Sequence, residues 1–276
     1  MTTPVGNRRA ASKSASAVVA ARKLGRRKER LARNLCVADG PQAVEYGLRT
    51  ARINQLFVTA FGADRFDVLV RRAQDAGVEV LDVDESTFAG LSESKSPQGI
   101  LGVADLPAPV PDLWQQEPRM VVLLERSQDP GNVGTVLRTA DAAGADFVVL
   151  GPGSADPFGA KCIRASAGSA FGIPVLEVQS VELALQAAKA VGLRVRGAAG
   201  DGAHLLYGPD ELDLTRSTLW VFGNEAQGLE QATLDACDEL VAVPMFGGAE
   251  SLNVGVAASL CMYATAAAQR FPATES

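Results

Sequence analysis

The amino-acid sequence predicts an α/β protein with two domains. Three observations lead to this prediction: a length of 276 residues, a globular composition with 47% hydrophobic and 21% charged residues, and a regular alternation of short apolar runs with amphipathic stretches. A chain of this length folds as two domains of ordinary size or as one large domain. The segment LPAPVPDLWQQEP at 106–118 interrupts the alternation with four prolines, so we expect an extended linker there.

The region before the linker is expected to form a small α/β domain over residues 16–105. Residues 1–15 have no apolar period, which predicts a disordered basic tail. A basic helix is expected over 17–34, where apolar residues recur every three or four positions. Strands are then expected at 35–40, 53–59, 78–83 and 98–105, and helices at 41–51, 64–77 and 85–92.

The pattern restarts after the linker and predicts a second domain over 119–276. Its strands are almost continuously apolar, which is typical of a parallel sheet covered on both faces. The expected strands are 120–125, 146–151, 172–178, 193–199, 218–223 and 239–245, and the expected helices are 132–144, 162–170, 180–192 and 252–269. Ligand sites in such sheets lie beyond the carboxyl ends of the strands, so we expect the chemistry in those loops.

Cysteine and histidine usage excludes several classes of site. The four cysteines are far apart without a CxxC pair, and His204 is the only histidine. A disulfide framework, a Cys/His zinc site and a catalytic triad are therefore disfavoured, and His204 is expected at the surface. The chain has no secretory signal and no membrane-spanning run, which predicts a soluble cytoplasmic protein.

The charge is distributed unevenly along the chain. Residues 1–35 hold ten basic side chains and one acidic one, for a net charge of +9, whereas the remainder carries −15. A basic arm of this kind can neutralise phosphates of a nucleic acid, although a solvated tail has the same composition. The candidate RNA-binding residues are Arg22, Lys23, Arg26, Arg27, Lys28, Arg30 and Arg33.

Three loops after predicted strands carry polar and glycine residues. In the first, at 123–145, Asp129 to Asn132 form a turn and Arg138 follows on the next helix, where a guanidinium can hold a phosphate. The second is WVFGNEAQGLE at 220–230, and the third is VAVPMFGGAESLNVGVAASL at 241–260. Taken singly, the first loop also fits an ordinary turn before a helix with an exposed arginine, the second a glycine turn with a solvent-facing acid, and the third a helix N-cap. None contains a P-loop lysine or a GxGxxG fingerprint.

Together the three loops point to one protein family far more specifically than any single loop does. The patterns N-x5-R, FGNEAQGL and VPM-x4-ESLNV, in this order, resemble the SpoU (TrmH) branch of the SPOUT family of RNA 2′-O-ribose methyltransferases. The segments VADGPQAVEYGL at 37–48 and KSPQGILGV at 95–103 resemble the family's L30e-like substrate-binding domain. The sequence departs from the family pattern at Ala226, where glycine is frequent, and at Gly255, where serine is frequent.

The resemblance implies a SPOUT α/β domain with a deep trefoil knot, S-adenosylmethionine as cofactor, and an active site shared across a homodimer. No metal is implied. The matching catalytic positions are Asn132, Arg138, Glu225, Ser251 and Asn253. The matching cofactor-binding positions are Gly223, Asn224, Gly228, Val243, Met245 and Leu252.

The substrate expected from the resemblance is RNA, with 23S ribosomal RNA favoured because a separate amino-terminal domain is typical of members that act on it. Transfer RNA is the alternative substrate. A non-catalytic RNA-binding protein with a degenerate knot is a further alternative. A small-molecule enzyme on a doubly wound fold and a Rossmann-class methyltransferase are disfavoured, because both use glycine-rich fingerprints that the sequence lacks.

Overall fold

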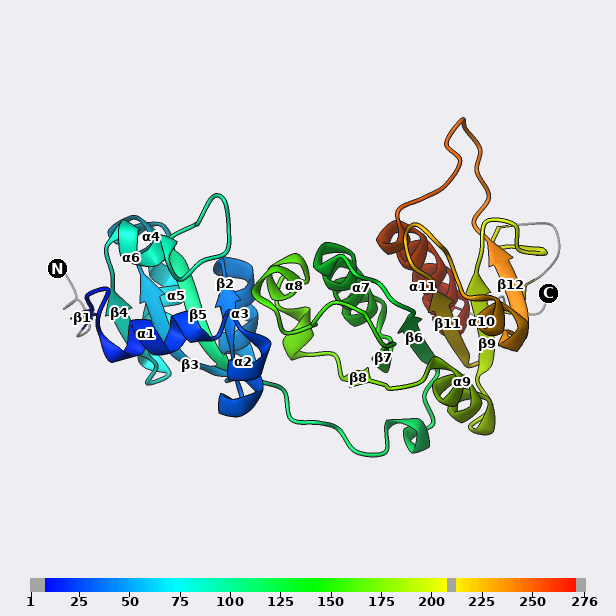
Figure 1. Cartoon of the computed structure of the whole chain (residues 1–276), viewed down its shortest axis with the longest axis horizontal. Helices are drawn as coiled ribbons and strands as arrows, with labels where there is room; N and C mark the ends of the chain where they lie inside the picture. Colours follow the sequence, from blue (N-terminus) through cyan, green and yellow to red (C-terminus); the bar gives the residue numbers. More distant parts are fainter. Residues whose placement is uncertain (1–7, 208–211, 272–276) are drawn as a thin grey trace. The chain divides into compact units, whose positions relative to one another are not determined.

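The computed structural model describes residues 8–207 and 212–271, and the chain divides into two compact units (Figure 1). The first unit contains the chain up to residue 108 together with the segment 156–172. The second contains 109–155 and the chain from 173 onward. Residues 1–7 of the predicted disordered tail lie outside the described part of the chain.

The first unit is built on a five-stranded mixed sheet. Its strand order is β1 (Arg9–Ala10), β4 (Glu79–Asp82), β3 (Ile53–Val58), β5 (Ile100–Asp105) and β2 (Leu35–Asp39). Strand β5 runs antiparallel to both β2 and β3, while β1, β4 and β3 are parallel. The pairing of β1 with β4 shows that part of the predicted disordered tail is an edge strand.

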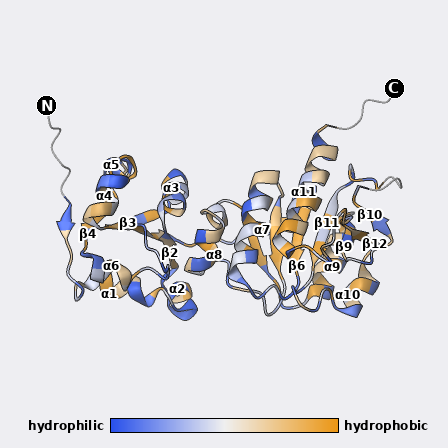
Figure 2. Cartoon of the chain, turned by 90° about the horizontal axis from the view of Figure 1, so that it is seen from above, coloured by the Kyte–Doolittle hydropathy of each residue, from blue (hydrophilic) through white to orange (hydrophobic). Residues whose placement is uncertain are grey.

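Helices cover both faces of this sheet (Figure 2). One face carries α1 (Ser16–Lys23), α2 (Arg27–Arg33) and α6 (Glu85–Ala89), and the other carries α3 (Pro41–Arg49), α4 (Ala60–Arg65) and α5 (Asp67–Asp75). The predicted single helix over 17–34 is therefore wrong, because two helices with a break at Gly25 occupy this region. The break lets Arg30 Nη1 donate to the carbonyl oxygen of Leu24, 2.7 Å away, at the end of α1.

The segment 156–172 leaves the second unit and packs on the first. It contains α8 (Ala160–Ala165) and the 3-10 helix η2 (Ser169–Phe171). Two ion pairs hold the segment: Arg164 Nη1 lies 2.7 Å from Asp39 Oδ2, and Arg30 Nη2 lies 2.5 Å from Asp156 Oδ2. These residues were expected in the second domain, because local periodicity carries no information about which sheet a helix covers.

The second unit is a seven-stranded parallel sheet. The apolar runs predict six of its strands but not the short strand at 204–205. Its strand order is β10 (His204–Leu205), β12 (Glu239–Ala242), β9 (Arg194–Ala198), β11 (Thr218–Phe222), β6 (Met120–Leu124), β7 (Phe147–Leu150) and β8 (Val175–Glu177). Every pairing in this sheet is parallel. All seven strands therefore end at one edge, where the sequence places its candidate loops.

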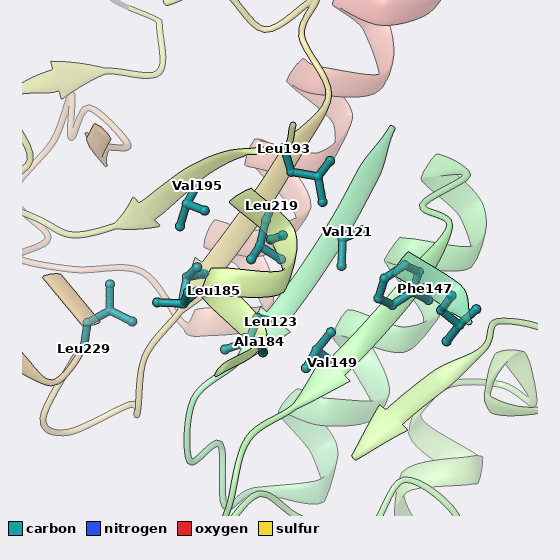
Figure 3. Close-up of a cluster of buried hydrophobic side chains, with 13 residues drawn as sticks. Val121, Leu123, Phe147, Val149, Ala184, Leu185, Leu193, Val195, Leu219 and Leu229 are labelled. Carbon is teal, nitrogen blue, oxygen red and sulfur yellow. The ribbon is translucent and has the colours of Figure 1, made fainter. Parts of the chain in front are cut away.

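Both faces of the second sheet are buried. On one face, Leu185 of α9 (Val181–Ala190) joins an apolar cluster with strand residues such as Leu123 and Leu219 (Figure 3). On the other face, Trp220 Nε1 donates to Thr265 Oγ1 of α11 (Val254–Arg270), 2.9 Å away. The remaining helices of this unit are α7 (Pro130–Ala143), α10 (Gln231–Ala236) and the 3-10 helix η1 (Leu113–Gln116).

The predicted linker is partly structured. Residues 113–116 form η1, where Leu113 is buried in the apolar cluster and the Trp114 ring packs edge-on against Phe147 at 4.9 Å between centroids. An apolar anchor of this kind fixes the start of the second unit.

Candidate active site

The three candidate loops meet at the carboxyl edge of the second sheet. The loops follow β6, β11 and β12. The loops after β11 and β12 line a cavity of about 400 Å³. The residues that line the cavity are Ala198, Ala199, Gly200, Phe222, Gly223, Asn224, Glu225, Gly228, Val241, Val243, Met245, Glu250, Ser251, Leu252, Asn253, Val254 and Ala257. Segments separated by more than 50 residues in the sequence thus form one concave site.

A chain of hydrogen bonds joins the three loops. Glu225 Oε1 accepts from Asn132 Nδ2 at 2.8 Å, and Asn253 Nδ2 donates to Asn132 Oδ1 at 2.9 Å. Asn253 Oδ1 also accepts from the backbone N–H of Gly255 at 2.9 Å, which caps the start of α11. Asn132 therefore holds Glu225 with its amide nitrogen and Asn253 with its amide oxygen.

The side chain of Asn224 shapes the second loop. Its Nδ2 donates to the carbonyl oxygen of Arg126 at 2.9 Å, and its Oδ1 accepts from Ala226 N at 2.9 Å and Gln227 N at 3.2 Å. The backbones of Asn224 and Gly228 pair with each other at the neck of the loop. Because Ala226 takes part through its N–H alone, an alanine serves this turn as well as a glycine.

Two glycines allow the neck of this loop to close. A Cβ on Gly223 would lie 2.2 Å from the carbonyl carbon of Gly228, and Gly228 has a φ of +69°, a conformation that other residues rarely adopt. The third loop depends on a similar close approach, since a Cβ on Gly255 would lie 2.9 Å from Thr135 Cγ2 of α7. The departure from the family pattern at Gly255 is thus accommodated by close packing of α7 and α11.

The cavity fits the chemistry of S-adenosylmethionine. Its volume suits a small cofactor, and its wall combines apolar side chains such as Val243 and Leu252 with the backbone of glycine turns. A neutral adenine ring needs such a slot, while the polar rim at Glu225, Ser251 and Asn253 can orient charged or hydroxyl groups. All six predicted cofactor-binding residues line this cavity.

Sequence reasoning missed two parts of the site. Ala198 to Gly200 line the cavity because β9 lies between β11 and β12 in the sheet, and strand order cannot be read from periodicity. Ser127 was also missed: its hydroxyl donates to Glu225 Oε1 at 2.9 Å. Its position two residues after the apolar run at 120–125 was the available signal.

Arg138 is the one predicted catalytic residue that the fold of this chain does not bring to the site. Its side chain is exposed on α7 and does not line the cavity. Since an α-helix has 3.6 residues per turn, the six-residue spacing places Arg138 about 120° around the helix from Asn132. The intramolecular geometry therefore assembles Asn132, Glu225, Ser251 and Asn253 without it.

The predicted RNA-binding arm is only partly exposed. Arg30 is 6% exposed and makes the buried contacts described above, so it does not belong to the solvent-facing basic surface. The other six residues are exposed: Arg22, Lys23, Arg26, Arg27, Lys28 and Arg33. We call these six residues the basic arm.

Within residues 8–207 and 212–271, no helix combines the length and the apolar character needed to cross a bilayer. In the same ranges, no three His, Cys, Asp or Glu side chains gather in a group suited to a metal ion.

A cavity beyond the carboxyl ends of a parallel sheet, with a few polar groups at its rim, is typical of a site for a small molecule. The model of the SpoU rRNA Methylase family matches residues 119–263, and that of the MRM3-like substrate binding domain matches residues 16–102. The chain belongs to the SpoU rRNA methylase family. The trefoil knot that the resemblance implies stays a prediction.

Relatives of known function and structure extend over almost the whole chain. The chain is 35% identical over 243 residues to the 23S rRNA (guanosine(2553)-2′-O)-methyltransferase RlmP of Bacillus subtilis strain 168, covering 88% of this chain and 92% of the relative. An AdoMet-bound rRNA methyltransferase from Sinorhizobium meliloti is 26% identical, with a TM-score of 0.76 and coverage of 95% and 98%. The SpoU methyltransferase AviRb from Streptomyces viridochromogenes, in complex with AdoMet, is 26% identical, with a TM-score of 0.77 and coverage of 94% and 99%.

The close approach at Gly223 gives a test of the cofactor site. Gly223→Ala is expected to weaken S-adenosylmethionine binding by about 10-fold or more, because the new Cβ must displace the Gly228 backbone that forms the cavity wall. Titration calorimetry measures the affinity. Gly247→Ala is the matched control, since a Cβ there meets nothing within 4 Å. Equal affinities of Gly223→Ala and the unchanged protein would contradict this assignment.

Proposed function

We propose that this protein transfers a methyl group from S-adenosylmethionine to a ribose 2′-hydroxyl of 23S ribosomal RNA in the cytoplasm. The observation that carries the proposal is the hydrogen-bonded network of Glu225, Asn132 and Asn253 at the rim of an apolar cavity. Membership of the SpoU family and the names of the relatives support the choice of reaction and of ribosomal RNA.

The chemistry requires orientation more than a strong base. S-adenosylmethionine, when bound, supplies an electrophilic methyl group on a sulfonium. The ribose hydroxyl is a weak nucleophile, so the protein gains rate by holding it in line and by stabilising the charge that develops on its oxygen. Glu225, Ser251 and Asn253 face the cavity and orient the ribose. Asn132 holds Glu225 and Asn253 in place through hydrogen bonds.

Arg138 completes the site in this proposal. A guanidinium stays protonated near neutral pH, so Arg138 binds the phosphate next to the target nucleotide and stabilises the developing alkoxide. The proton passes to that phosphate or to water. Because Arg138 lies outside the cavity of its own subunit, we assign it to the cavity of a partner subunit in a homodimer.

An apolar stripe on α11 supports the homodimer. Val256 and Tyr263 are 47% and 53% exposed, and Leu260 and Ala267 share their face at helical spacing. Helix α11 packs along α7, where Thr139 Oγ1 and Ser259 Oγ lie 3.0 Å apart. A symmetric contact through this stripe would bring the Arg138-bearing helix of each subunit next to the interface.

RNA is bound by the first unit in this proposal. The basic arm lies in the region that matches a substrate-binding domain. Its charges suit the phosphates of RNA, which this unit can recognise through shape and exposed loops.

Label transfer tests the function. The protein is incubated with methyl-labelled S-adenosylmethionine and with unmodified 23S rRNA or unmodified transfer RNA. We expect label on 23S rRNA at one ribose, mapped by resistance of the adjacent linkage to alkaline cleavage. Label on transfer RNA alone would replace the proposed substrate, and an absence of label with intact cofactor binding would favour a non-catalytic RNA-binding protein.

Mixing two inactive variants tests the shared site. Arg138→Ala and Glu225→Ala are each expected to abolish most activity, because each removes one half of a composite site. When subunits exchange freely at equal amounts, half of the dimers are mixed and each mixed dimer has one intact site. About one quarter of the original activity should therefore return. Mixtures as inactive as the separate variants would show that Arg138 does not complete the cavity of a partner subunit.

Salt dependence tests the basic arm. Combined replacement of Lys23, Arg26 and Lys28 by alanine is expected to weaken RNA binding and to reduce the slope of log K against log salt concentration by about 2, because each lost phosphate contact contributes about 0.7 to 0.9. Filter binding at several salt concentrations gives the slope, and S-adenosylmethionine affinity serves as the control for folding. An unchanged slope would remove the arm from the RNA interface.

A further inference from the structure

Three consecutive residues after β6 hold the loop 223–230 along its whole length. Glu125 is 2% exposed, and its carboxylate accepts from Thr233 Oγ1 at 2.6 Å and from Glu230 N at 3.0 Å. The carbonyl oxygen of Arg126 accepts a hydrogen bond from Asn224 Nδ2 at 2.9 Å. Ser127 donates to Glu225 Oε1. One short segment thus fixes both ends of the loop and the carboxylate between them.

Ser127 makes the contact closest to the proposed chemistry. Its side chain is fully buried, and its hydroxyl lies 2.9 Å from Glu225 Oε1. Its carbonyl oxygen accepts from Ala155 N at 2.8 Å, so the backbone that carries the hydroxyl is itself anchored. The hydroxyl is therefore presented from a fixed position rather than from a mobile surface chain.

Two donors saturate one oxygen of Glu225. Ser127 Oγ and Asn132 Nδ2 both donate to Oε1, at 2.9 Å and 2.8 Å. No hydrogen bond from another described residue reaches Oε2, and Glu225 lines the cavity. A glutamate side chain has several rotamers, and two donors on one oxygen select the orientation that leaves the other oxygen free.

We propose that Ser127 is a positioning residue for methyl transfer: it fixes the Glu225 carboxylate so that Oε2 accepts a hydrogen bond from the substrate. This inference rests on the proposed function. Asn132 supplies only one of the two donors to Oε1, and a carboxylate held by a single donor can still rotate about that contact. Ser127 binds no other described side chain through its hydroxyl, so its contribution to catalysis passes through Glu225.

A double-mutant cycle between Ser127 and Glu225 tests the proposal. Ser127→Ala should lower kcat at saturating unmodified 23S rRNA by about 10-fold, the loss expected for one hydrogen bond to a charged group. The affinity for S-adenosylmethionine and the KM for RNA should stay within about 2-fold, because the cavity wall is unchanged. Ser127→Thr keeps the hydroxyl and should restore most of kcat. In a Glu225→Ala background, Ser127→Ala should cause no further loss.

The matched control is Thr87→Val in the first unit. Thr87 is also fully buried, and its hydroxyl also donates to a carboxylate, Asp84 Oδ2 at 3.1 Å. Its replacement should leave kcat unchanged at saturating RNA. Thermal unfolding of all variants separates a loss of stability from a loss of turnover.

The outcomes are distinct. A further loss of about 10-fold on adding Ser127→Ala to Glu225→Ala would show that Ser127 acts independently of Glu225, and an unchanged kcat of Ser127→Ala would show that it does not act at all. Either result overturns the proposal. If the unchanged protein itself methylates neither ribosomal nor transfer RNA, the proposed function fails instead, and that failure is recognised before any variant is compared.

Discussion

The hydrogen bonds of Asn132 are the contacts on which the site depends. An asparagine amide has a donor end and an acceptor end, and here each end holds a side chain from a different loop. The parallel sheet brings the loops to one edge. The amide converts this proximity into a fixed arrangement of Glu225 and Asn253. Loss of either contact would leave the Glu225 carboxylate or the Asn253 amide without its Asn132 partner at the rim of an apolar cavity.

The parts of the fold that could be predicted are those governed by local periodicity. The buried strands of the second unit, such as β6 and β11, read as continuous apolar runs, and the structure confirms a parallel sheet. The break at Gly25 was missed because residues on both sides keep a helical pattern. The order of strands, which brings Ala198 to Gly200 into the cavity, depends on contacts between distant segments and leaves no local signal.

The candidate site, like the fold, was predictable where the signal is local to the sequence. Polar residues at loop positions, such as Glu225 and Asn253, stand out against apolar strands, and the structure brings them together. Net charge alone was a weaker guide for the basic arm. Arg30 has the same sequence context as its basic neighbours, yet it turns inward to Asp156, a residue that is 126 positions away. Ser127 was missed because a single hydroxyl beside a strand has many ordinary roles.

The segment 156–172 has a consequence for dissection of the protein. Because the chain passes between the two units three times, no single cut separates them into two self-contained pieces. A catalytic fragment excised after the proline-rich segment would still carry α8, whose Cys162 and Ile163 are fully buried within the first unit. Those side chains would then face water, and a transplanted second unit would be prone to aggregate unless its α8 surface were redesigned. The two units are therefore best regarded as one inseparable module for grafting or truncation.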